Sequence, residues 1–186
     1  MLEKTSELVS AFVEATGLPA SRVGNIARVL ISSGWLPGAR AARVPPVEPA
    51  DHPLGPQHVA ALMLAMSAER VLDAERVLVR LADLHTGDGP DTGALAIITE
   101  LLLSDDLPPD ADFVSLLPPY SVIVGGILAD IAPNGKRVGG GVPDRALHVL
   151  QYPSAVVRRL RRIAQSTRGY HIASAIIEAE EAGSIQ

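Results

Sequence analysis

Apolar residues recur at helical spacing near the start of the chain. Leu8 and Phe12 lie four positions apart, as do Val9 and Val13. Residues four apart share one face of a helix, so the spacing predicts a helix over residues 3–15 with a single apolar stripe. This apolar face has to pack against another apolar surface, and the residues that follow provide one.

A short turn and a second helix follow. Gly17 suits the left-handed conformation that often ends a helix, and Pro19 cannot continue the hydrogen-bond ladder. The second helix is expected over residues 20–33, ending at Gly34, after which residues 35–37 are expected to fold an apolar edge back onto the pair. Its apolar face contains Val23, Ile26, Ala27, Leu30 and Ile31. Helix, tight turn and helix together are the pattern of a helix-turn-helix.

The middle of the chain reads as a proline-rich linker and then more helix. Six prolines fall between residues 37 and 56, which disfavours both helix and central strand. Pro56 suits the first position of the next helix, over residues 57–66. Ser67 is a candidate cap for a further helix over residues 68–84. Another helix is expected to open at Asp91 or Thr92 and to run to about Leu103.

The period changes after Pro108-Pro109. Residues 120–124 and 127–131 look like strands, bent at Gly125-Gly126. Asn134-Gly135 is a strong hairpin signal. The segments expected after it are a return strand over 136–142, a short strand over 147–150, a helix over 155–164 capped by Ser154, and a helix over 170–182.

These elements predict a mainly α protein of the α+β class. The expected division is a helix-turn-helix DNA-binding domain over 1–44, a proline-rich linker over 45–55, and a helical and β-hairpin oligomerisation domain over 56–186. The chain has 186 residues, of which 47% are hydrophobic, so it can bury a sizeable core. It has no cysteine, which excludes disulfides, thiolate metal sites and cysteine nucleophiles.

Charge is distributed in blocks along the chain. Residues 15–47 contain four arginines and no acid, residues 48–130 contain fourteen acids and three bases, and residues 136–168 contain eight bases and one acid. The formal net charge of -5 therefore hides a basic head and a basic segment near the end. Local basic segments in an otherwise acidic chain favour contact with a polyanion. Ordinary solvated helix faces are the alternative.

The second helix carries the residue types that read DNA. In a helix-turn-helix this helix enters the major groove, where Arg bridges guanine and Asn bridges adenine. The candidate contacts on the helix and on the basic arm behind it are Ser21, Arg22, Asn25, Arg28, Arg40 and Arg43. An ordinary helical hairpin shares the same periodicity, and it is the competing interpretation.

A second basic cluster lies in the helix over 155–164. Val156, Val157, Leu160 and Ile163 are expected on its buried face, so its arginines are expected to project outward. The cluster consists of Arg158, Arg159, Arg161 and Arg162. These side chains fit contact with phosphates or, equally, ion pairs with the acidic middle of this or another subunit.

Signals for other chemistry are missing from the sequence. The five histidines have no metal-ligand spacing, no nucleophile-elbow motif is present, and Gly139-Gly140-Gly141 departs from the phosphate-binding glycine patterns. We therefore expect no metal, no cofactor and no enzymatic activity.

The longest uncharged stretch, residues 113–129, is interrupted by prolines and glycines, and the start of the chain is charged, so we expect no membrane contact and a cytoplasmic location.

Two sequence blocks carry a resemblance. The turn Gly17-Leu18-Pro19-Ala20-Ser21-Arg22-Val23 and the exit Gly34-Trp35-Leu36 resemble those of winged-helix transcription regulators. The arm, together with the block that starts at Gly55-Pro56, is similar to a group of phage and prophage DNA-binding proteins. The resemblance covers about the first 85 residues and implies a phage regulator.

The expected function is sequence-specific binding of double-stranded DNA by a transcriptional regulator. We expect a homodimer or higher homo-oligomer, because one such helix reads only a half-site. A small terminase-like packaging subunit, which would form rings, and a protein-binding adaptor of transcription are the alternatives.

Overall fold

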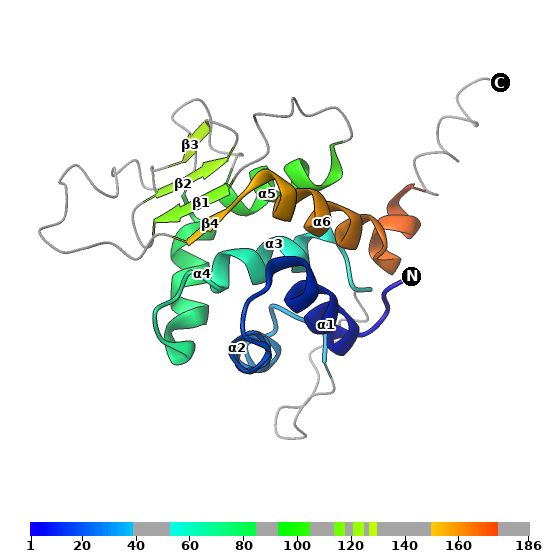
Figure 1. Cartoon of the computed structure of the whole chain (residues 1–186), viewed down its shortest axis with the longest axis horizontal. Helices are drawn as coiled ribbons and strands as arrows, with labels where there is room; N and C mark the ends of the chain where they lie inside the picture. The colour runs from blue at the N-terminus through cyan, green and yellow to red at the C-terminus, as the bar shows by residue number, and fades with distance from the viewer. Residues whose placement is uncertain are drawn as a thin grey trace, which may run out of the picture.

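Helices form most of the described part of the molecule, and one small sheet lies at its side (Figure 1). The protein is therefore mainly helical, as the sequence predicts. The computed structural model describes residues 1–38, 53–84, 93–104, 114–117, 121–124, 127–129 and 150–174.

The N-terminal helices form where the pattern of apolar residues predicts them. α1 covers Thr5–Thr16 and α2 covers Ala20–Ser32. Gly17 ends α1 with φ 70°, and its amide donates to the Val13 carbonyl at 2.8 Å. A positive φ is strained for residues with a Cβ, so glycine is the residue that this turn requires.

The start of α1 and the segment after α2 are both held by hydrogen bonds. The Glu7 carboxylate accepts from the amides of Glu3 and Lys4 at 3.0 and 3.2 Å, and these bonds lower the pKa of Glu7. After α2, Leu36 is buried, and the Thr5 hydroxyl donates to the Pro37 carbonyl. The apolar exit thus folds back onto the pair, as expected.

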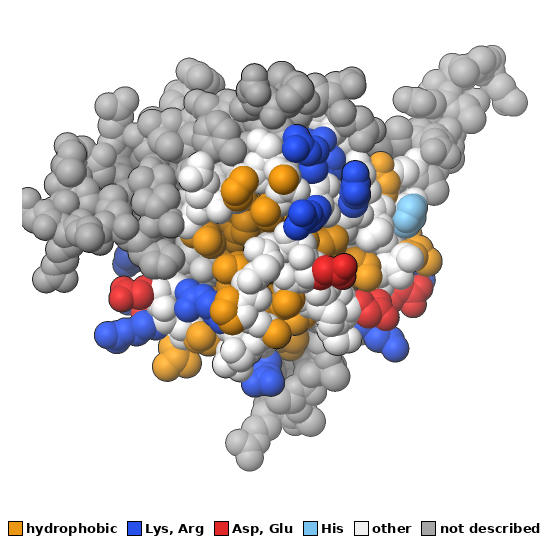
Figure 2. Space-filling view, viewed as in Figure 1, with side chains coloured by type: hydrophobic (Ala, Val, Ile, Leu, Met, Phe, Trp, Pro, Cys, Tyr) orange, Lys and Arg blue, Asp and Glu red, His pale blue; other side chains and the backbone are white. Residues whose placement is uncertain are grey.

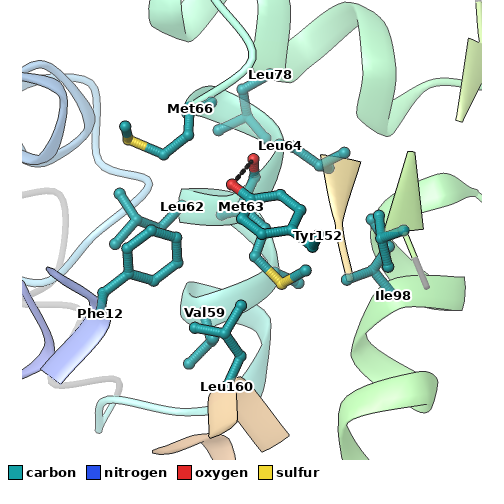
Figure 3. Close-up of a cluster of buried hydrophobic side chains, with 14 of the residues drawn as sticks. Phe12, Val59, Leu62, Met63, Leu64, Met66, Leu78, Ile98, Tyr152 and Leu160 are labelled. Carbon is teal, nitrogen blue, oxygen red and sulfur yellow. Dashed lines mark hydrogen bonds between the residues drawn. The ribbon is translucent and has the colours of Figure 1, made fainter. Parts of the chain in front are cut away.

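α3, which covers Pro56–Ala65, is the central helix of the fold. Every residue of α3 except Gln57 is buried, and α2, α4, α5 and α6 all pack against it. Figure 3 shows the cluster around it, in which the buried Tyr152 hydroxyl donates to the Met63 carbonyl at 3.0 Å. Burial raises the pKa of Tyr152, so this phenol remains a hydrogen-bond donor.

The helix predicted over residues 68–84 begins later than expected. The structure has a 3-10 turn, η1, at Val71–Asp73 and then α4 at Ala74–Ala82. Ser67 does not cap a helix, because its hydroxyl donates back to the Leu64 carbonyl at 2.6 Å. Arg70 is extended, with φ -108° and ψ 140°, so the chain leaves α3 through a short irregular segment.

α5 covers Ala94–Leu103 and leads towards an antiparallel sheet in the order β3-β2-β1-β4. The predicted strands 120–124 and 127–131 correspond to β2 (Ser121–Val124) and β3 (Ile127–Ala129), which pair with each other. β1 (Val114–Leu117) was not predicted from the sequence. β4 (Leu150–Tyr152) lies later in the chain than the strand predicted over 147–150. The predicted Asn134-Gly135 hairpin and its return strand lie outside the described residues.

α6 covers Ser154–Gln165 and runs back across α1, α3 and α5 (Figure 1). Its N-cap is Pro153 and not Ser154, which is the first residue of the helix. Residues 168–174 are helical as well, and the rest of the helix predicted over 170–182 lies outside the described residues. The Leu2 amide donates to the Ser166 carbonyl at 2.7 Å, which ties the start of the chain to the end of α6.

One continuous cluster of buried apolar side chains joins the N-terminal helices to the rest of the molecule. Phe12 of α1 meets Tyr152 of β4 edge to face, with ring centroids 6.5 Å apart. The α1–α2 pair therefore shares its core with α3, α6 and the sheet. Within the described ranges, no helix has both the length and the apolar character needed to cross a membrane.

Candidate nucleic-acid interface

α2 presents one open polar stripe. Ser21, Asn25, Arg28 and Ser32 are all exposed, and their spacing of four, three and four residues keeps them on one side of the helix. Asn25 Oδ1 accepts from Arg28 Nη1 at 2.9 Å, so the two side chains are oriented together. α2 contains no acidic residue, so the stripe is positively charged as well as exposed.

Arg22 is placed differently from the other candidates. Its guanidinium donates to the Ala68 carbonyl and, at 3.4 Å, to the Glu69 carbonyl, both just beyond the end of α3. These bonds hold α2 against the irregular segment before η1, and they satisfy carbonyls that lie outside a helix. In this structure Arg22 therefore contacts protein backbone, whereas Ser21, Asn25 and Arg28 point to solvent.

The N-terminus of α2 has no side-chain cap. Pro19 stands at the N-cap, its carbonyl accepts from the amides of Arg22 and Val23 at 3.0 and 3.1 Å, and no acid lies in the first turn. The partial positive charge of a helix N-terminus is therefore not offset by an acid on α2. An anion approaching this end of α2 meets a positive potential close to Ser21.

The second basic cluster is on α6. Arg158, Arg159 and Arg162 are exposed, while Val157, Leu160 and Ala164 of the same helix are buried. The expected outward projection holds for these three arginines but is wrong for Arg161, whose Nε and Nη2 atoms are buried without a hydrogen-bond partner. Arg161 lies one helical turn from both Val157 and Ala164, which explains its position at the edge of the buried face.

The fold brings α6 to the end of α1 that leads into α2. Arg159 Nη1 donates to the Ala15 carbonyl at 3.4 Å, across 144 residues of sequence. Arg159 and Arg162 also line a shallow cavity of about 260 Å³ with Ala11, Glu14, Ala15 and Ile163. Ala15 lies only five residues before the first residue of α2. Two basic segments that are distant in sequence thus lie on either side of one turn.

Figure 2 shows a group of basic side chains over α6, and separate basic side chains lie lower in the view, with apolar and acidic side chains between the two. α6 carries four arginines, and the cations of α2 are Arg22 and Arg28. Glu14 lies beside the α6 cluster, yet neither Arg159 nor Arg162 forms an ion pair with an acid of the described residues. An ion pair between two described residues joins Arg76 of α4 to Asp73 of η1 at 2.9 Å.

The other candidates lie elsewhere or outside the described part of the chain. Arg40 and Arg43 of the basic arm are outside the described residues. The described ranges contain no group of three or more His, Cys, Asp or Glu side chains placed to hold a metal ion. The position of Glu14 beside Arg159 and Arg162 was not predicted, since no local pattern in the sequence shows that α6 lies against α1.

Comparisons with protein-family models, curated proteins and solved structures give no match to this chain. The resemblance to winged-helix and phage DNA-binding proteins therefore stays a prediction from the sequence. What the structure adds is the position of the charged side chains of α1, α2 and α6.

Proposed function

We propose that this chain is a phage-type transcriptional regulator that binds double-stranded DNA in a sequence-specific manner, with α2 as the reading helix. The observation that carries the proposal is the exposed, acid-free stripe of Ser21, Asn25 and Arg28, placed directly after a tight turn. Asn and Arg are the side chains that pair bidentately with adenine and guanine in the major groove. Ser21, at the N-terminus of the helix, suits a phosphate contact.

The roles of the two arginines of α2 differ in this proposal. Arg28 reads a base edge together with Asn25, to which it is already hydrogen-bonded. Arg22 positions the helix by holding the carbonyls that follow α3. Because one such helix reads only a half-site, we propose that the protein acts as a homo-oligomer. A native mass that corresponds to a dimer supports a regulator, whereas a large ring favours DNA packaging.

The test starts from selection of bound sites out of a random-sequence duplex library. The wild-type chain is expected to enrich a defined site. On that site, Asn25→Ala or Arg28→Ala is expected to weaken binding by roughly 1–3 kcal/mol, which is about five- to 150-fold. Fluorescence anisotropy of a labelled duplex measures both values.

Arg80→Ala is the matched control, because Arg80 is an exposed arginine on α4, which is neither of the two helices proposed to contact DNA. Equal losses for Arg28→Ala and Arg80→Ala would show that only overall charge matters. Failure of the wild-type chain to retain any duplex at low salt would rule out the proposed function.

A further inference from the structure

We infer that α6 is a second contact of the same duplex, in which Arg159 and Arg162 bind backbone phosphates beside the base-reading helix α2. This inference rests on the proposed function and extends it, since it names the part of the ligand that the α6 cluster takes. The ligand chemistry is a row of phosphodiesters.

The composition of α6 favours a polyanion over a neighbouring helix. Its twelve residues include four arginines and no acid. Arg159 and Arg162, both exposed, lie three positions apart, so like charges are neighbours on the exposed face. Such pairs destabilise a helix by a few tenths of a kcal/mol each. A cluster that weakens its own helix is expected where a ligand neutralises it.

The surroundings of the cluster fit a phosphate better than a base. Arg159 and Arg162 line a shallow cavity, and not a deep slot that could admit a planar ring. Arg159 is steadied by the Ala15 carbonyl through one weak bond at 3.4 Å, which leaves the rest of its guanidinium fork available. Guanidinium groups bind phosphate oxygens bidentately, with charge-assisted hydrogen bonds.

The position of the cluster couples it to α2. Ala15 belongs to the last turn of α1, and α2 begins at Ala20 after the turn at Gly17. α2 is about 20 Å long, at about 1.5 Å per residue. Duplex DNA carries one phosphate charge for about every 1.7 Å of its axis. Arg159, bonded to the Ala15 carbonyl just before this turn, is therefore the α6 side chain placed to meet a phosphate near the N-terminus of α2.

Glu14 acts against this contact and gives a test of its own. It lines the same cavity as Arg159 and Arg162, and it is exposed. Its negative charge lowers the positive potential of the cluster without forming an ion pair to either arginine within the described residues. Removing that charge is expected to strengthen phosphate binding.

The experiment measures duplex affinity of the full chain as a function of salt. The probe is a labelled duplex of about three helical turns, either with the selected site or with a scrambled sequence. Arg159→Ala with Arg162→Ala is expected to lower the slope of log K against log salt by about 2, on both duplexes alike. Arg159→Lys with Arg162→Lys keeps the charges and is expected to restore the slope. Glu14→Gln is expected to tighten both duplexes two- to fivefold at low salt.

The outcomes separate this inference from the proposed function. If wild type binds a selected site and the double alanine variant keeps the wild-type slope, α6 does not contact the duplex while α2 still reads it. If the double variant keeps the slope but loses thermal stability, the α6 arginines pair with acids of the protein instead, and the inference is overturned. If wild type binds no duplex, both proposals fail together.

Discussion

At the scale of single residues, Arg22 shows how helical geometry sorts neighbours in the sequence. Ser21, Asn25 and Arg28 share one stripe, whereas Arg22 is about 100° further around the helix and falls in line with the buried Ile26. The sequence therefore already contained the reason why Arg22 lies against protein. It did not contain the partner, because the carbonyls of Ala68 and Glu69 come from an irregular segment that the pattern presented as helix.

Replacing Arg22 is accordingly expected to act on stability. Arg22→Ala leaves the Ala68 and Glu69 carbonyls without their donors, so we expect the free energy of unfolding to fall by about 1–3 kcal/mol. Arg28→Ala, on the exposed stripe, is expected to change it by less than about 0.5 kcal/mol. Urea unfolding followed by circular dichroism measures both. If the two variants are equally stable, Arg22 does not hold α2 in place and is again a candidate DNA contact.

At the scale of elements, the prediction from sequence was accurate wherever a long amphipathic pattern ended in a strong signal. α1, α2, α3 and α6 begin and end within about two residues of their predicted bounds. The prediction failed where the signal was short. The order of apolar and polar residues over 68–73 is compatible with a helix, but in the structure this segment is the irregular exit from α3. β1 has only four residues, and although β2 follows it closely in the sequence, its other partner, β4, begins only at Leu150.

The turn between α1 and α2 allows a matched test of glycine. Gly17 has φ 70°, and a Cβ added there would meet no atom within 4 Å, so Gly17→Ala is expected to destabilise through backbone strain alone, by about 1–2 kcal/mol. Gly24 lies inside α2, also with no neighbour within 4 Å, and Gly24→Ala is expected to stabilise by about 0.5–1 kcal/mol. Thermal unfolding of the two variants should shift in opposite directions, and a shift of the same sign would contradict this account of the turn.

At the scale of the whole molecule, the sequence could not show how the parts meet. Nothing in residues 1–44 indicates that Phe12 packs on Tyr152, or that Arg159 reaches Ala15. Both contacts depend on chain segments more than a hundred residues apart, and local pattern carries no information at that range. The candidate site is therefore partly predictable, since α2 and α6 were each predicted, but the contact of α6 with α1 was not.

The shared core leads to a prediction about cooperativity that bears on the division expected at residue 44. Leu8 and Phe12 of α1, and Ile26 and Leu30 of α2, are fully buried in the cluster that also contains α3 and α6. Full burial of such side chains contributes about 1.5–3 kcal/mol each, and helices of this length are marginal in isolation. The helix pair is therefore expected to unfold together with the rest of the chain.

The single tryptophan makes this measurable. Trp35 lies just after α2 and packs partly against the core, so its fluorescence reports on the N-terminal pair, while far-UV circular dichroism reports on all helices. In urea the two transitions are expected to coincide, as one two-state step requires. Phe12→Ala is expected to shift both by the same amount, with a loss of about 3–5 kcal/mol, and Ser10→Ala on the exposed side of α1 is the control. An earlier transition of Trp35 alone would instead establish residues 1–44 as a separate domain, and the reading helix would then depend on the rest of the chain only through the linker.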